Sequence, residues 1–299
     1  ANPIATDSQS VLGVERLLAI KGYIDELADF VNNVYLVDVA AIGAFYADWT
    51  KVGKGVTNYL SVPALPLDTK GTKFAVPGGY IKGGDLAGYK PITSFNDAYF
   101  RDGVQESVKH AWYKGGKGAL HPYKGETVPQ YTDFQDNGKY SWVKSPTFYG
   151  DTVQVGPLAR VLAWAAAKYE PGLRHLNRVI GMAESIAKTK IPLDALHSTI
   201  GRHAARAVVC GSMVENLQQQ WQLLIDNIAK GDVKTFNKPE LPKGAVSGFG
   251  FHEAPRGLTP RRGRAVAGLD LGDASPPADV ERRRRLPVHL LEAGDHPVA

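Results

Sequence analysis

The most regular segment of the sequence runs from Leu193 to Gly231 and reads "LDALHSTIGRHAARAVVCGSMVENLQQQWQLLIDNIAKG". Apolar residues recur along it in alternating steps of three and four, which is the spacing of one face of an α-helix. Gly231 lies where a glycine commonly ends a helix. We therefore predict one helix of roughly forty residues, ~55 Å long. Its apolar stripe consists of Leu193, Leu196, Ile200, His203, Ala207, Cys210, Val214, Leu217, Trp221, Leu224 and Ile228.

Helical spacing recurs in two other parts of the chain. Apolar residues keep it from Leu17 to Trp49, and shorter helical patterns cover about 155–188 with a pause at 170–172. Residues 50–150 instead carry repeated Gly, Pro and Tyr, which allow only short strands and turns. The predicted fold class is mainly α: a long-helix bundle with a loop-rich, short-strand insertion.

Composition narrows the function classes. The 299 residues are 43% hydrophobic and 22% charged, as in an ordinary globular protein. The net charge of +5 comes from interspersed charges and an Arg-rich tail, so we expect no nucleic-acid partner. No apolar run reaches the ~20 residues of a transmembrane helix, so we expect no membrane span in this chain. The one cysteine, Cys210, excludes a disulfide framework and a Cys-x-x-Cys metal clamp.

The reactive residue types have structural interpretations. Cys210 and His203 lie on the apolar stripe of the last helix, which favours a buried thiol and a core or interface histidine. His110 and His121 lie in loop-rich sequence with aromatic neighbours, and we expect both to be packed loop histidines rather than contacts to a partner or substrate.

No carboxylate pair or nucleophile has the spacing that catalysis requires. Three carboxylates lack a paired partner: Glu184, Asp194 and Glu215. Asp25, Glu26 and Asp29 form a solvated patch more readily than an acid–base pair. His197 and Ser198 are adjacent, which on a helix points their side chains about 100° apart. The residues alone therefore contain no complete active site.

Several ordered segments nevertheless resemble one known family. They are "ANPIATDSQSVLGVERLLAIKGYIDELADFVNNVYLVDV", "VKHAWYK", "LHPYKGETVPQYT", "GKYSWVKSPTFYGDTVQVGPLARVL", "STIGRHAARAV", "WQLLIDNIAKGD" and "GFGFHEAPRG". In this order they resemble the middle and later parts of the large subunit of nickel-iron uptake hydrogenases. The resemblance covers residues 1–257 nearly continuously.

That resemblance implies a specific chemistry. Such subunits hold a nickel-iron centre with cyanide and carbon monoxide ligands, oxidise dihydrogen, and pass electrons to an iron-sulfur small subunit at the periplasmic face of the cytoplasmic membrane. The family binds these metals through two Cys-x-x-Cys pairs, and neither pair occurs here. We therefore expect a hydrogenase large-subunit fold that is incomplete at both ends and inactive alone. The alternative is a non-catalytic scaffold or interaction module.

The same resemblance assigns a role to the motif "EAPRG", residues 253–257. It implies that Arg256 projects its guanidinium over the metal centre and that Pro255 lines the pocket around the diatomic ligands. A guanidinium stays charged and offers hydrogen-bond donors in a fixed geometry, which suits such a position. Without the resemblance, Arg256 would be interpreted as an ordinary loop arginine that caps a helix or pairs with Glu253.

The composition changes abruptly after Gly257. Residues 1–257 contain 20 Lys and 8 Arg, whereas the tail that follows has 7 Arg, no Lys and no aromatic residue. We therefore predict a partial hydrogenase domain over 1–257 and a disordered or frameshifted tail over 258–299. A basic arm for nucleic acid or lipid is the competing interpretation, but six acidic residues leave the tail a net charge of only +1.

Overall fold

The computed structural model describes residues 12–68, 70–115, 119–120, 128–234 and 246–265. The chain divides into two compact units, one made of 1–238 with 249–262 and the other of 239–248 with 263–299. Of the second unit, the described residues are 246–248 and 263–265, which belong to two paired strands. All helices of the described chain lie in the first unit.

The N-terminal helix is long and contains a π-helical turn. Helix α1 (Val14–Phe30) continues through the π turn Val31–Tyr35 into α2 (Leu36–Phe45). Such a turn leaves backbone carbonyls without their usual helical partners. The guanidinium of Arg178 compensates by donating to the carbonyl oxygen of Asn32 at 2.8 Å and to its Oδ1 at 3.0 Å. The predicted helix is thus confirmed through Phe45, and Trp49 lies in a following 3-10 turn, Ala47–Lys51.

The helix predicted from Leu193 to Gly231 is divided near its start. Leu193–His197 form a 3-10 turn, and α6 proper covers Thr199–Ala229, or 31 residues. The reason is Ser198, whose Oγ accepts a hydrogen bond from the amide of Gly201 at 3.0 Å and so caps a new helix start. Gly231 follows the helix with a φ of +84°, which confirms its predicted place at the C-terminal end.

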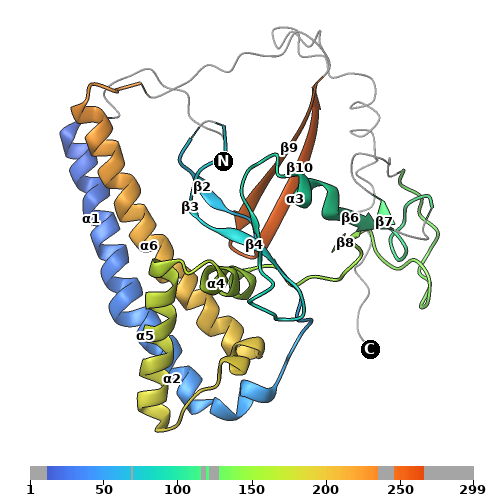
Figure 1. Cartoon of the computed structure of the whole chain (residues 1–299), viewed down its shortest axis with the longest axis horizontal. Helices are drawn as coiled ribbons and strands as arrows, with labels where there is room; N and C mark the ends of the chain where they lie inside the picture. The colour runs from blue at the N-terminus through green and yellow to red at the C-terminus, as the bar shows by residue number, and fades with distance from the viewer. Residues whose placement is uncertain (1–11, 69, 116–118, 121–127, 235–245, 266–299) are drawn as a thin grey trace, which may run out of the picture. The chain divides into compact units, whose positions relative to one another are not determined.

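The helices pack around a common core. Helices α1 and α6 run side by side, and α2 lies against both α5 (Glu170–Ala187) and α6 (Figure 1). Helix α4 (Pro157–Ala166) packs on α5 and α6 and buries Trp164 almost completely. The predicted pause at 170–172 is instead the first turn of α5, where Gly172 leaves room for the Trp164 ring.

Short strands occupy the region predicted to be loop-rich. Their bounds are β1 (Tyr59–Leu60), β2 (Ala64–Pro66), β3 (Phe74–Val76), β4 (Gly78–Ile81), β5 (Lys90–Ile92), β6 (Val104–Ser107), β7 (Ala119–Leu120) and β8 (Ser145–Phe148). They form small antiparallel sheets in the orders β1-β4-β5, β2-β3 and β7-β6-β8, and a short helix, α3 (Ala98–Gly103), precedes β6. With these strands, the mainly α fold class is confirmed only in part.

A longer hairpin crosses the predicted domain boundary. Strand β9 (Val246–Ala254) pairs with β10 (Gly257–Ala265). Residues 258–265 of the predicted tail therefore form a strand. Residues 266–299 lie outside the described residues, so a disordered or frameshifted tail stays a prediction.

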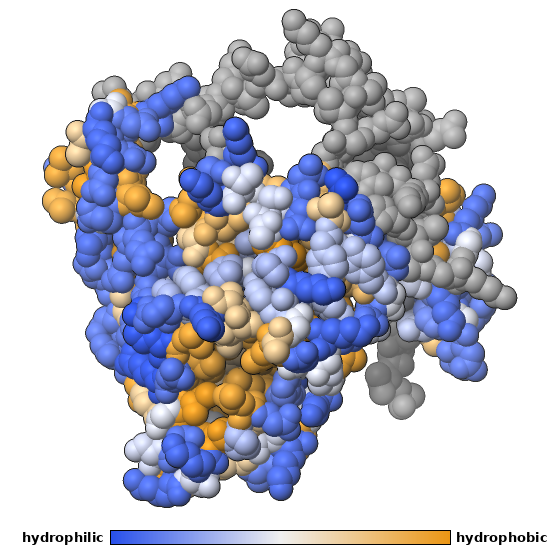
Figure 2. Space-filling view, viewed as in Figure 1, coloured by the Kyte–Doolittle hydropathy of each residue, from blue (hydrophilic) through white to orange (hydrophobic). Residues whose placement is uncertain are grey.

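The helix over 14–45 has an exposed apolar side. Tyr23 is 71% and Phe45 83% exposed, and Figure 2 shows apolar surface over the helical part of the molecule. By length and composition this helix could also cross a membrane, although it packs against α5 and α6. The expected lack of a membrane span is therefore not confirmed. One such helix is weak support for a span, because core helices of larger proteins share these properties.

A glycine inside α2 gives a test of this packing. A Cβ at Gly43 would meet only Cγ2 of Ile200 at 3.5 Å, an ordinary contact. We expect Gly43→Ala to raise the free energy of unfolding by about 0.4–1 kcal/mol, because alanine restricts the unfolded chain. Urea unfolding measures this change. The matched variant Gly201→Ala should be destabilised, because its Cβ would lie 2.3 Å from the backbone of Leu196. Equal effects of both substitutions would contradict the packing described here.

Candidate functional site

The motif "EAPRG" forms the turn between β9 and β10. Strand β9 ends at Ala254, strand β10 begins at Gly257, and Pro255 and Arg256 connect them. Proline presets the backbone of the first turn position. Both connecting side chains are exposed. Among the described residues, no hydrogen bond or ion pair joins Arg256 to Glu253, so the structure does not bring together the pair considered from the sequence.

Two glycines let this turn lie directly against the start of α4. Gly156 is the N-cap of α4 with a φ of +103°, and a Cβ there would lie 2.8 Å from the carbonyl oxygen of Arg256. Gly257 has a φ of +142°, and its Cβ would lie 2.6 Å from Cγ2 of Val155 and 3.0 Å from the nitrogen of Gly156. Only glycine fits these backbone conformations and distances, so the contact fixes the turn that carries Arg256.

Substitution of Gly257 tests this contact. We expect Gly257→Ala to lower the free energy of unfolding by about 1–3 kcal/mol, because backbone strain and a steric clash both oppose the new methyl group. Gly150→Ala is the control for backbone strain alone, since Gly150 has a φ of +81° and no atom within 4 Å of the new Cβ. Chemical unfolding of both variants measures the difference. A Gly257→Ala protein as stable as Gly150→Ala would show that the close contact is absent.

Behind the turn, strand β9 buries an acidic side chain. Oε2 of Glu253 accepts a hydrogen bond from the amide of Val62 at 2.9 Å, whereas Oε1 is buried without a hydrogen-bond partner in the part of the chain that the structure describes. Burial raises the pKa of Glu253 to about 7, and the charge of Arg160 and the Val62 hydrogen bond oppose this rise only in part. The carboxyl group can therefore change its charge near neutral pH.

Arg160, whose charge acts on Glu253, is also buried. Arg160 lies within α4, and its guanidinium is 5.3 Å from the centre of the Trp164 ring, with Nη2 donating to Sδ of Met213 at 3.6 Å. Burial lowers the pKa of Arg160, and the charge of Glu253 opposes this shift. The interaction between Arg160 and Glu253 was not predicted from the sequence. The available signal was one charged residue within the apolar stretch "PLARVLAWAA" of α4.

The cysteine and the histidines considered from the sequence do not lie in the Pro255–Arg256 turn. Cys210 is half-buried against the core of α6, and burial raises the pKa of its thiol, which makes it a poor thiolate ligand. His203 is exposed beside Tyr46 and Trp49, so a core position for it is wrong. His110 is packed as predicted, with Nδ1 2.7 Å from the carbonyl oxygen of Gly138. His121 lies outside the described residues.

The remaining candidates have structural partners. The three carboxylates form ion pairs: Glu184 with Lys190, Asp194 with Lys54, and Glu215 with Arg174. Asp25 pairs with Lys21 at the surface, and Asp29 accepts a hydrogen bond from Asn33. His197 contacts the hydroxyl of Tyr59 and Ser198 caps α6. One further buried group, His175, was not predicted from the sequence. Its Nε2 lies 3.0 Å from Oε1 of Glu215, and burial lowers the pKa of its imidazole.

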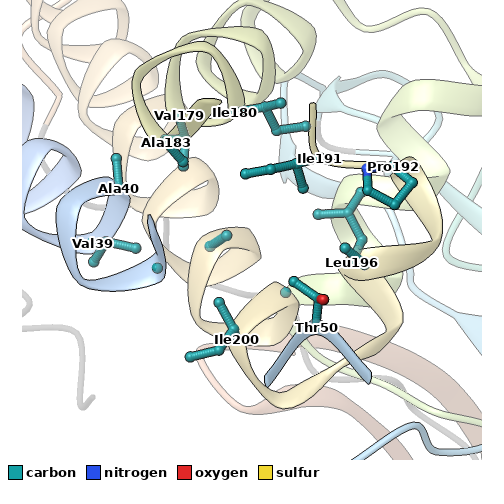
Figure 3. A pocket seen from close by; sticks show the side chains of 14 residues that line it. Val39, Ala40, Thr50, Val179, Ile180, Ala183, Ile191, Pro192, Leu196 and Ile200 are labelled. Atoms are coloured by element: carbon teal, nitrogen blue, oxygen red, sulfur yellow. The ribbon is translucent and has the colours of Figure 1, made fainter. Parts of the chain in front are cut away.

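An apolar pocket lies among the helices. It has a volume of about 50 Å³ and is lined by α2, α5, α6 and the segment before α6 (Figure 3). Val39 and Ala40 approach from α2, and Val179, Ile180 and Ala183 from α5. Thr50 supplies the only polar side chain among its lining residues. The lining residues therefore suit a small apolar molecule, and they include no acid–base side chain.

Comparison with known proteins shows where this chain belongs. The family model of nickel-dependent hydrogenases matches residues 1–260. The chain is a member of the nickel-dependent hydrogenase family. The match ends three residues after Gly257, where the sequence analysis placed the change in composition. The resemblance stated from the ordered segments is thus confirmed.

Individual relatives agree with this assignment. The Hydrogenase-2 large chain of Escherichia coli K12 is 50% identical over 259 residues, covering 86% of this chain and 46% of that protein. The uptake hydrogenase large subunit of Bradyrhizobium diazoefficiens is 37% identical, covering 85% and 46%. The solved Ni-Fe-Se hydrogenase from D. vulgaris Hildenborough superposes with a TM-score of 0.65 at 25% identity, covering 85% and 48%. The chain spans about half the length of these hydrogenases.

The donor set of the described residues does not fit a nickel-iron centre. Within the described ranges, no group of three or more His, Cys, Asp or Glu side chains is placed to hold a metal ion. The single thiol of the sequence, on Cys210, favours its protonated form because it is half-buried. Because the type of ligand largely decides which metal a site binds, a nickel-iron centre held by thiolates would need several of them.

Proposed function

We propose that this chain is part of a hydrogenase large subunit whose complete form oxidises dihydrogen and passes the electrons to an iron-sulfur small subunit. The observation that carries the proposal is the 50% identity to the Hydrogenase-2 large chain over 259 residues. By itself the chain should be inactive, since its sequence has one cysteine for a centre that the family binds through thiolates. A nickel-iron centre with cyanide and carbon monoxide ligands belongs to the proposed complete form.

Within that subunit we assign Arg256 the catalytic role and Pro255 a place in the wall of the active-site pocket. Two features support this assignment: the side chains of Pro255 and Arg256 are exposed, and Gly156 and Gly257 hold the backbone of the turn against α4. A preorganised guanidinium stabilises charge that develops near it, because its donors need not reorganise during the reaction.

A chimaeric enzyme tests the proposal. Residues 1–257 of this chain would replace the matching segment of the Hydrogenase-2 large chain of E. coli and be assembled with that enzyme's small subunit. We expect hydrogen-dependent dye reduction by the chimaera and none by the 299-residue chain alone. Nickel content is measured in parallel. A chimaera that assembles with its nickel but does not oxidise hydrogen would contradict the proposal.

The second candidate is a scaffold or interaction module without catalysis. The exposed apolar side of the helix over 14–45 favours it, because large exposed apolar surfaces commonly bind other chains. The two candidates differ in a simple assay. A scaffold would bind the hydrogenase small subunit in the absence of nickel, and its chimaera would remain inactive although correctly assembled.

A further inference from the structure

We propose that Glu253 is a positioning residue: its buried carboxyl group clamps strand β9 to the backbone at Val62 and thereby fixes the Pro255–Arg256 turn. This inference rests on the proposed role of Arg256. It assigns a part in holding the turn to Glu253, which precedes Pro255 by two residues on β9.

The path from the core to the turn is short. Along β9, Phe251 and Glu253 are buried whereas His252 between them is exposed, as strand alternation requires. Phe251 packs with its ring centre 5.0 Å from that of Phe95 and 5.3 Å from that of Phe100. Two residues further, the carboxylate of Glu253 accepts the Val62 amide at 2.9 Å. The next anchored residue is Gly257, so Pro255 and Arg256 are held from both sides.

Only one of the two carboxyl oxygens of Glu253 has a hydrogen-bond partner among the described residues, so the contact depends on whether the carboxyl group is ionised. Oε1 of Glu253 is buried and, among the described residues, has no hydrogen-bond partner. No ion pair of the described chain joins Glu253 to Arg160, although their charges interact. Among the described residues, the charge of Arg160 acts on Glu253, and Cys210 and Tyr169 act on Arg160 in turn. A buried carboxyl group with a pKa of about 7 gains or loses its attraction to Arg160 near neutral pH.

Hydrogen exchange in this chain tests the clamp without any need for activity. Peptides covering 60–64 and 254–258 would be followed in wild type, Glu253→Gln and Glu253→Ala. We expect Glu253→Ala to speed exchange in both peptides by about tenfold or more, because the Val62 amide loses its buried acceptor. Glu253→Gln keeps an acceptor of the same shape and should stay close to wild type. His252→Gln, on the exposed side of β9, is the matched control and should change neither peptide.

The pH profile of the chimaeric hydrogenase separates positioning from a purely structural role. We expect the wild-type kcat to change with an inflection near pH 7 that Glu253→Gln abolishes, with nickel content unchanged. Arg256→Lys should lower kcat at every pH and keep the inflection. The pH profile can be measured only if the chimaera with the unsubstituted segment is active. An inactive chimaera would overturn the proposed function, and the role of Glu253 would then be decided by hydrogen exchange alone.

Two results overturn the inference. One is a Glu253→Ala chain whose 254–258 peptide exchanges like wild type, because the turn would then be fixed without the carboxyl group. The other is an active Glu253→Gln chimaera that retains the full inflection near pH 7, because another group would then titrate. Faster exchange in Glu253→Ala with rescue by Glu253→Gln supports it.

Discussion

Replacing Arg256 by Lys is expected to lower hydrogen oxidation by roughly 10²–10³-fold in the complete chimaeric enzyme, with nickel content nearly unchanged. Lysine keeps the positive charge but replaces the planar guanidinium and its fixed donors with a flexible, strongly hydrated ammonium. The turn itself should fold in the variant, because the Gly156–Gly257 contact involves the backbone and not the Arg256 side chain. The loss should therefore appear in kcat rather than in assembly.

The measurement is hydrogen-dependent dye reduction at saturating hydrogen, with metal analysis of the same sample. Arg174→Lys is the matched control, because Arg174 forms an exposed ion pair with Glu170 on α5 and has no proposed role in catalysis. Unaltered turnover in Arg256→Lys would remove the catalytic role of this residue. A variant that lacks nickel would instead show that Arg256 serves assembly of the site.

The helices could be predicted from the sequence because their contacts are periodic and local. The apolar steps from Leu17 to Phe45 and along α6 appear directly in the chain. The divided start of α6 depends on one side chain, Ser198, which competes for the helix start as an N-cap. The small sheets were predicted only as short strands, because pairings such as Leu60 with Tyr80 depend on residues distant in sequence.

The candidate site was predictable only through the resemblance. Its motif, residues 253–257, has no spacing that identifies chemistry, and Arg256 is exposed in this chain. The electrostatic interaction of Glu253 with Arg160 could not be found from the sequence, since the two residues lie on β9 and α4 and their charges interact only after the hairpin packs. For His203 only the core interpretation is wrong, because a place on the apolar stripe of α6 does not by itself bury a side chain, and His203 is exposed beside Tyr46 and Trp49. An interface position stays a prediction.

The stability of the chain should depend on pH through Glu253. Its folded pKa of about 7 lies above the ordinary 4.5, so the folded state binds a proton more tightly than the unfolded state. Stability from this group is therefore fully present below pH ~4.5 and is lost as the pH rises through about 7. Between pH 5 and pH 8 the loss amounts to about 2–3 kcal/mol.

Glu253→Gln isolates this contribution, because glutamine has the same shape and no titration. We expect the free energy of unfolding of the variant, relative to that of wild type, to rise by about 2–3 kcal/mol from pH 5 to pH 8. Urea unfolding of both proteins at each pH measures this difference. Other titrating groups, such as His175 and His197, act in both proteins and cancel in this difference. A difference between the two proteins that stays constant with pH would mean that Glu253 is ionised in the folded chain throughout, and that the charge of Arg160 outweighs its burial.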